Sequence, residues 1–193
     1  MLNAKTCLLA AAALTLLLLV ACDRDHDPRY SGWNRYTDED DGYVILLPPG
    51  WVVEGEMMQT MRGVRLYDKD MVTPPLAGRV YCSIYAKDRD ADAPPFAERA
   101  TALVDELLRG LWCDNQITQE SGNLAGLPAT RFAIAGYDCA VGISQRALVM
   151  VLEAEGKDFI LFATSTNESW LVFEETFQLM YSSFELVKSA ESE

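Results

Sequence analysis

The chain has 193 residues, of which 16 are basic and 29 are acidic, so its formal net charge is −13 at pH 7. A protein this acidic is repelled by nucleic acid and by anionic lipid headgroups, which excludes both as expected partners. About 50% of its residues are hydrophobic, and its length is that of one domain with a proper hydrophobic core.

The first feature along the chain is an apolar run over residues 8–21. It follows Lys5 and is shorter than the roughly 20 residues that a membrane-spanning helix needs, so it predicts the core of a signal peptide. The sequence at its end, Leu19-Val20-Ala21-Cys22, resembles a bacterial lipobox. This resemblance implies cleavage between Ala21 and Cys22 and a lipid on Cys22. An ordinary cleaved signal or a short anchor helix is the alternative.

A lipid on Cys22 would fix the compartment of the protein. Only Lys5 of the 16 basic residues lies in residues 1–21, so the mature chain would carry a net charge of −14. Two or three acyl chains hold a protein stably on a membrane, whereas one chain binds with an association constant of only about 10⁴ M⁻¹. We therefore expect a lipid-anchored, periplasm-facing protein of the cell envelope. Asp23 resembles the signal that retains lipoproteins in the inner membrane, but Arg24 is not a usual reinforcing residue, so the choice of membrane stays open.

Residues 22–41 are polar and predict a tether, followed by a single domain over residues 42–188 and a tail over residues 189–193. Within the domain we expect strands at 43–47, from 51 onward, at 64–67 and at 79–87. The strand at 79–87 alternates, with Cys82 on one face and Tyr81 and Tyr85 on the other.

The second half of the domain combines further strands with two helices. Apolar residues at spacings of three and four predict a helix over 94–110, with Asp92 as its cap or a neighbour of the cap. The remaining predicted elements are strands at 116–120 and 129–135 joined by a Gly-rich turn over 121–128, strands at 145–153 and 159–164, and a helix over 168–181. This order favours an antiparallel sheet with helices, an α+β fold, and argues against a nucleotide-binding doubly wound fold.

Three segments in this order resemble the domains of PsbP-like proteins. They are the strand and Pro-Gly-Trp turn over residues 42–51, the Gly-x-Pro-Ala turn over 126–129, and the Phe and Ser-Phe ending over 177–184. The resemblance implies an α-β-α sandwich, in which helices flank a twisted antiparallel sheet. Most known members of this group bind other proteins and are not enzymes, so it also implies a binding role.

Few residues suit catalysis or metal binding. The one histidine, His26, lies in the predicted tether, where it cannot orient a nucleophile or a zinc ion. Asp88, Asp90 and Asp92 have the spacing of a calcium loop, but Ala93 and Arg99 stand where that loop needs Gly and Glu. We therefore expect a solvated loop there, a solvated acidic end of the tether at 38–41, and neither a metal nor a cofactor.

Three cysteines remain beyond Cys22. The predicted chain direction brings Cys113 and Cys139 to the same end of the sheet, which suggests a disulfide between them, with Cys82 as a buried, inert thiol. Three free thiols are the alternative.

Tyr81, Tyr85 and Arg79 are the candidate partner-binding residues. If one edge of the sheet is open, they form an aromatic and basic patch; if both faces are covered, the tyrosines belong to the core. The sequence thus predicts a non-catalytic, lipid-anchored module that binds an envelope or secreted protein. A small-ligand or lipid-binding pocket protein is the alternative, and an uncharacterised hydrolase is the third.

Overall fold

The computed structural model describes residues 27–58, 61–71, 80–109, 112–138, 142–154 and 156–187. The chain divides into two units, Met1–Trp33 and Asn34–Glu193. The described part of the first unit holds a short 3-10 helix, Pro28–Tyr30, capped by the Asp27 side chain. The predicted signal peptide, Ala21, Cys22, Asp23 and His26 lie outside the described residues.

The second unit contains two antiparallel sheets and, among its described residues, two α-helices. Its elements are β1 (Asn34–Asp38), β2 (Tyr43–Leu47), β3 (Trp51–Met58), β4 (Met61–Asp68), the 3-10 helix Lys69–Met71, β5 (Tyr81–Asp88), α2 (Phe96–Leu108), β6 (Asp114–Leu124), β7 (Leu127–Asp138), β8 (Ile143–Glu153), β9 (Lys157–Thr166), α3 (Asn167–Ser182) and β10 (Glu185–Leu186). The prediction of an α+β fold with mostly antiparallel strands is confirmed. Among the described residues, no helix is long and apolar enough to span a membrane.

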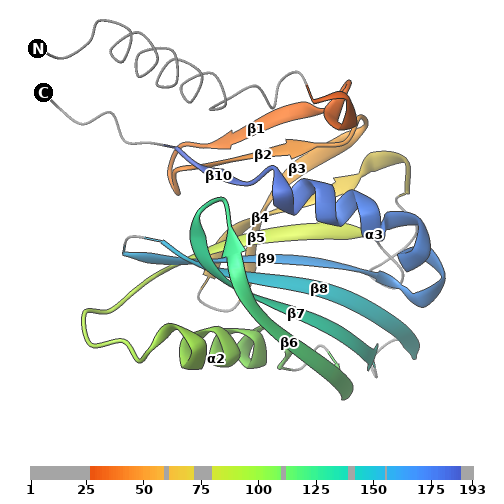
Figure 1. Cartoon of the computed structure of the whole chain (residues 1–193). Helices are drawn as coiled ribbons and strands as arrows, with labels where there is room; N and C mark the ends of the chain where they lie inside the picture. Colours follow the sequence, from red (N-terminus) through yellow and green to blue (C-terminus); the bar gives the residue numbers. More distant parts are fainter. Residues whose placement is uncertain are drawn as a thin grey trace, which may run out of the picture. The chain divides into compact units, whose positions relative to one another are not determined.

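A seven-stranded sheet in the order β3-β4-β5-β9-β8-β7-β6 forms the middle layer. Figure 1 shows α2 on one side of this sheet, with α3 and the small sheet β1-β2-β10 on the other. Both faces of its central strands are therefore buried, which explains the unbroken apolar runs of β8 and β9. The predicted sandwich is confirmed, with the difference that a three-stranded sheet shares one outer layer with α3.

The core on the α2 side follows from the apolar stripe of the helix. Ala100, Leu103, Val104 and Leu107 are each at most 5% exposed and pack against alternate residues of β7, β8 and β9. Burying a Leu or Val side chain contributes about 1.5–3 kcal/mol, so this stripe holds α2 on the sheet. Asp92 does not cap the helix, because it lies three residues before the N-cap position. Pro95 occupies that position and makes no side-chain hydrogen bond.

The core on the α3 side is aromatic and joins two of the segments that carry the PsbP-like resemblance. Trp51 contacts Phe177 at 6.3 Å between ring centroids, and Tyr43 stacks on Phe184 at 5.5 Å. The first residue of each pair comes from residues 42–51 and the second from residues 177–184. The resemblance therefore rests on one packed core.

The predicted tether ends earlier than expected. Asn34–Asp38 forms β1, which pairs with β2 over five residues, so the folded unit begins at Asn34 and not at residue 42. Asp41 in the β1–β2 turn accepts an ion pair from Lys157 at 2.8 Å, so the acidic stretch at 38–41 is not a solvated linker end. The sequence of β1 looks like a linker because it contains no aliphatic residues. It becomes a strand because β2 supplies the partners for its backbone hydrogen bonds.

The Gly-rich turn predicted over residues 121–128 is also shorter than expected. The β6–β7 pairing runs without interruption from Asp114↔Tyr137 to Leu124↔Leu127. Only Ala125 and Gly126 form the turn, and both have positive φ values, 53° and 81°. Two such residues complete a hairpin of this kind, so the flanking polar residues extend the strands.

Candidate interaction surface

The residues predicted to bind a partner do not form an exposed patch. Tyr85 is 0% exposed in the α2 core, and its hydroxyl donates to Glu56 Oε2 at 2.9 Å. Tyr81 is half-buried and packs on Phe162 with ring centroids 5.9 Å apart. Arg79 lies outside the described residues. The patch prediction is wrong for Tyr85, because α2 covers that face of β5, and the alternative of core tyrosines holds.

The cysteines lie as the sequence suggests, as far as the structure describes them. Cys82 is free and fully buried, and burial raises the pKa of its thiol well above the ordinary value. Cys113 directly precedes β6, and its backbone N–H donates to the Tyr137 carbonyl oxygen at 3.0 Å. Because Cys139 lies outside the described residues, the Cys113–Cys139 disulfide stays a prediction.

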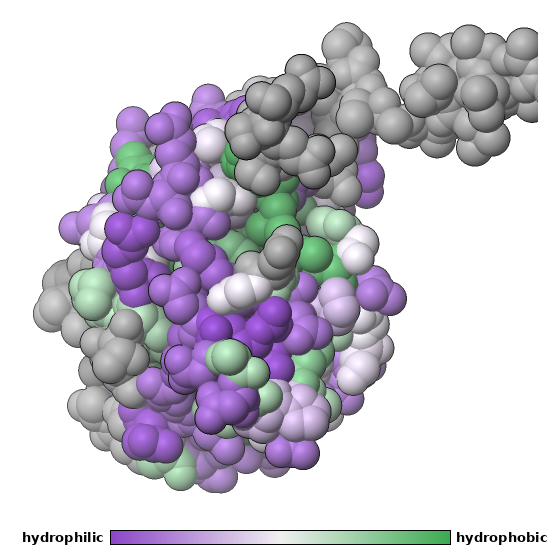
Figure 2. Space-filling model, turned by 90° about the vertical axis from the view of Figure 1, so that its left-hand side faces the viewer, coloured by the Kyte–Doolittle hydropathy of each residue, from purple (hydrophilic) through white to green (hydrophobic). Residues whose placement is uncertain are grey.

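The first cavity, called the charged pocket below, lies between the start of α2 and the β8–β9 turn. It has a volume of about 280 Å³, and Lys87, Arg89, Arg99, Glu106 and Asp158 are among its lining residues. Figure 2 shows the side of the molecule that carries this turn, on which hydrophilic residues cover most of the surface. Asp88, Asp90 and Asp92, which have the spacing of a calcium loop but were expected to form a solvated loop, line the same pocket.

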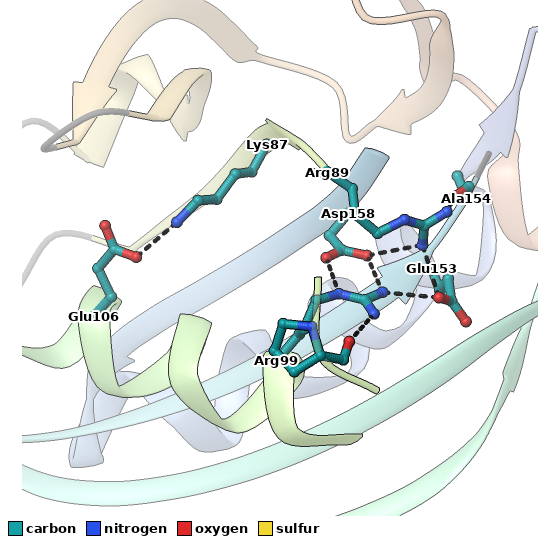
Figure 3. Close-up of polar contacts among 8 residues, drawn as sticks. Lys87, Arg89, Arg99, Glu106, Glu153, Ala154 and Asp158 are labelled. Atoms are coloured by element: carbon teal, nitrogen blue, oxygen red, sulfur yellow. Dashed lines mark hydrogen bonds and ion pairs between the residues drawn. The ribbon is translucent and has the colours of Figure 1, made fainter. Parts of the chain in front are cut away.

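The three basic side chains of this pocket bind neighbouring carboxylates (Figure 3). Arg99 donates from Nε to Asp158 Oδ2 at 2.8 Å and from Nη2 to Asp158 Oδ1 at 3.0 Å, and it also reaches Glu153 at 2.8 Å. These hydrogen bonds raise the pKa of Arg99, so it stays cationic. Arg89 donates to the same Glu153 oxygen at 2.7 Å, and Lys87 to Glu106 at 2.9 Å. This closed network ties α2 to β8 and β9.

A second cavity, of about 390 Å³, lies between the β1–β2 turn and the β3–β4 hairpin. Its lining includes the carboxylates of Asp40, Asp41 and Glu56. Arg62 binds Asp40 at 3.1 Å and Asp41 at 3.4 Å, while Ser83 donates to Glu56 at 2.7 Å. Neighbouring cations and hydroxyls thus satisfy these carboxylates. Within the described part of the chain, no group of three His, Cys, Asp or Glu side chains is placed to hold a metal ion.

The third region is open. On the α3 side of the large sheet, α3 packs on β9 and β8, and β6 and β7 extend beyond it. Residues 114–123 of β6 are all exposed. Two adjoining hollows of about 250 and 340 Å³ follow this uncovered area. We call this surface the shelf; it is lined by Gln116, Thr118, Arg131, Ala133, Ala135, Tyr137, Arg146, Trp170 and Glu174.

The floor of the shelf combines small and long polar side chains. Ala133 and Ala135 of β7 leave it hollow, and Trp170 of α3 forms part of its wall. Large apolar residues are exposed on α3, the helix that supplies Trp170 to the shelf. Leu171 is 81% exposed and Val172 69% exposed. Exposed apolar side chains beside polar groups are typical of protein-binding surfaces.

Comparisons with known proteins agree with this architecture. No protein-family model matches the chain, and no curated protein matches its sequence. Among solved structures, the cyanobacterial PsbP (CyanoP) from Synechocystis matches with a TM-score of 0.62 at 16% identity, covering 87% of this chain and 98% of that one. The protein has the PsbP-like fold.

Two further structures share this PsbP-like fold. LpqN, described as involved in cell envelope biogenesis of Mycobacterium tuberculosis, matches with a TM-score of 0.57 at 12% identity, covering 80% of this chain and 90% of its own. The Ran-binding protein Mog1p of Saccharomyces cerevisiae matches with a TM-score of 0.56 at 10% identity, covering 81% and 96%. At these identities the likeness concerns the fold alone.

The sequence of β6 carries a signal for the shelf. β6 reads Asp-Asn-Gln-Ile-Thr-Gln-Glu-Ser-Gly-Asn-Leu, with polar residues at almost every position. A strand covered on one face alternates polar and apolar residues, so a strand this polar is exposed on both faces. The ion pair between Arg99 and Asp158 had no comparable signal, because 59 positions separate the two residues in sequence.

Proposed function

We propose that the protein is a lipid-anchored protein of the cell envelope that binds another envelope or secreted protein without catalysing a reaction, and that the shelf is its binding surface. The single observation that carries this proposal is the uncovered sheet face over β6 and β7, next to Trp170 of α3. The basic side chains of the charged pocket, by contrast, already bind carboxylates.

The compartment in this proposal comes from the lipobox-like sequence ending in Cys22, which implies a periplasm-facing domain. The PsbP-like fold supports it indirectly, because LpqN has this fold and is described as involved in cell envelope biogenesis. Mog1p shows that the fold also serves a protein described as Ran-binding. Incorporation of radiolabelled palmitate into the wild-type protein, and its loss in Cys22→Ser, would test the anchor.

The binding surface can be tested by photo-crosslinking in the native host. A benzoylphenylalanine at Gln116 would report on the shelf, and one at the exposed Glu98 of α2 would serve as the control on the opposite side of the sheet. We expect covalent adducts from Gln116 only, and fewer of them when Cys22→Ser releases the domain from the membrane. Equal adducts from both positions, or none from either, would contradict the proposal.

The alternative of a small-ligand protein has one specific candidate, the charged pocket of about 280 Å³. An anionic ligand there would compete with the carboxylates that Arg99 already binds, and breaking those contacts costs free energy. Native mass spectrometry of the purified domain distinguishes the two functions: a co-purified small molecule would favour the pocket.

A further inference from the structure

We infer that the partner bound at the shelf contributes an extended segment that pairs with the outer edge of β6 and adds an eighth strand to the large sheet. This inference rests on the proposed function and names the form in which the partner binds. Figure 1 shows β6 as the last strand of the sheet, and among the strands that the structure describes its only neighbour is β7.

The edge of β6 is long, regular and exposed. It pairs with β7 over eleven consecutive residues without a bulge, and residues 114–123 are exposed. A strand edge of this length offers a row of backbone N–H and C=O groups that only another extended backbone can satisfy in full. The chemistry of the edge therefore selects an extended segment over a helix.

Two devices that usually block such pairing, proline and basic side chains, are missing from β6. Proline, lysine and arginine do not occur between Asp114 and Leu124, although natural edge strands often carry them as protection. The opposite edge of the same sheet, β3, does have such a device. Its Glu56 is a charged residue turned inward, with a side chain only 11% exposed. The two edges of the sheet thus differ in how open they are to a further strand.

The side chains around β6 define the chemistry of the segment. The charged residues of β6 are Asp114 and Glu120, and Glu120 already has an ion pair with Arg131 at 3.3 Å. Asp114 lines the shelf near Tyr137. We expect the segment to carry a lysine or arginine facing Asp114, which also agrees with the net charge of −13 of the full chain. On the other face, Ile117 favours an apolar or β-branched residue.

The pairing geometry provides a substitution that tests the backbone and spares the shelf. In a hairpin closed by a two-residue turn, the residues flanking the turn form a hydrogen-bonded pair. From there along β6, the backbone N–H and C=O groups of successive residues point alternately to β7 and to the free edge. Gln119 is five positions from Leu124, so its N–H points to the free edge. Proline is tolerated at such a position because the lost N–H has no partner within the sheet.

The experiment combines Gln119→Pro with the benzoylphenylalanine crosslinker at Gln116, in the full-length protein in its native host. Gln119→Ala is the matched control, since it removes the same side chain and keeps the N–H. We expect Gln119→Pro to lower the crosslinked fraction at least tenfold while Gln119→Ala leaves it within twofold. Circular dichroism and thermal unfolding of both variants establish that the fold is retained.

The outcomes separate this inference from the proposed function. If no protein is captured from Gln116 in the wild type, the proposed function fails and the inference with it. If a protein is captured equally by wild type and Gln119→Pro, the shelf binds a partner but strand addition is wrong. Adducts of twice the chain mass would show that the partner is a second copy of this chain, and the assignment of a basic segment from another protein would then be wrong.

Charge gives an independent check of the same segment. Asp114→Lys should lower the crosslinked fraction severalfold, and Asp114→Asn should lower it less, because the first change repels a basic residue and the second only removes its attraction. Peptide mapping of the adduct should show a captured segment with a lysine or arginine and no proline. A captured acidic segment, or an adduct unaffected by Asp114→Lys, would contradict the assignment.

Discussion

The charged pocket and the shelf lie on opposite faces of one sheet and differ in how their arginine side chains are paired. In the charged pocket, Arg99 makes three short contacts to Asp158 and Glu153, and Asp158 is 4% exposed. On the shelf, Arg146 lines an open hollow and is exposed. A cluster of charges in a cavity can therefore be part of the framework, while a polar strand can be the surface that is left for a partner.

The largest expected effect would come from opening the charged pocket. Arg99→Ala leaves the buried Asp158 carboxylate without its main cation, so we expect the free energy of unfolding to fall by about 3–5 kcal/mol. Arg146→Ala on the shelf should change it by less than about 0.5 kcal/mol. Urea unfolding of both variants measures the contrast. Similar losses in the two variants would show that the distinction between the pocket and the shelf is wrong.

The next effect concerns the ends of β6 and β7, next to the shelf. If Cys113 and Cys139 are bridged, reduction should lower the free energy of unfolding by about 3 kcal/mol, as expected for a closed loop of this length. Unfolding with and without dithiothreitol measures it, and Cys113→Ser should be insensitive to the reductant. Peptide mapping under non-reducing conditions that found Cys82 in a bridge would refute the assignment.

A smaller effect distinguishes two glycines in strands on the closed and open parts of the sheet. A Cβ at Gly63 of β4 would collide with the Ile84 carbonyl oxygen and lie 2.6 Å from the Tyr85 ring. Gly63→Ala should therefore cost about 1–3 kcal/mol. At Gly122 of β6 a Cβ meets nothing within 4 Å, so Gly122→Ala should be neutral or slightly stabilising. Thermal unfolding ranks the two, and a costly Gly122→Ala would mean that the outer face of β6 is not free.

The smallest effect lies in the core beneath α3 and reverses with pH. Tyr181 donates to the Leu148 carbonyl oxygen at 2.7 Å, so Tyr181→Phe should cost about 0.5–1.5 kcal/mol at pH 8. Burial raises the pKa of Tyr181 well above its ordinary value, so the folded state keeps it neutral at high pH. The unfolded state ionises it above pH 10, which lowers the stability of the wild type by about 1.4 kcal/mol per pH unit.

Tyr181→Phe lacks this ionisation, so the deficit of the variant should shrink above pH 10 and change sign near pH 11. Urea unfolding at pH 8 and pH 11 measures both values. A deficit that stays constant between the two pH values would show that Tyr181 ionises in the folded state as well. The tyrosine would then be accessible from the solvent, in contrast to its 2% exposure.

Much of the fold could be predicted from the sequence because local patterns determine it. The apolar stripe of α2 and the alternation in β5 each specify one face, and the helix predicted over 168–181 is observed as Asn167–Ser182. What could not be predicted depends on contacts between distant residues. β1 looked like a linker because its partner β2 is needed to make it a strand. The sequence alone could not show whether Tyr81 and Tyr85 form an exposed patch or belong to the core, because this depends on where α2 packs.

One strand of the small sheet has a consequence for how the protein folds. β2 pairs on one side with β1, near the start of the folded unit, and on the other with β10, close to its end. The layer beside α3 is therefore complete only after residues 185 and 186 have been synthesised. Contacts between sequence-distant segments slow folding, so the aromatic core beneath α3 stays partly exposed until β10 pairs with β2.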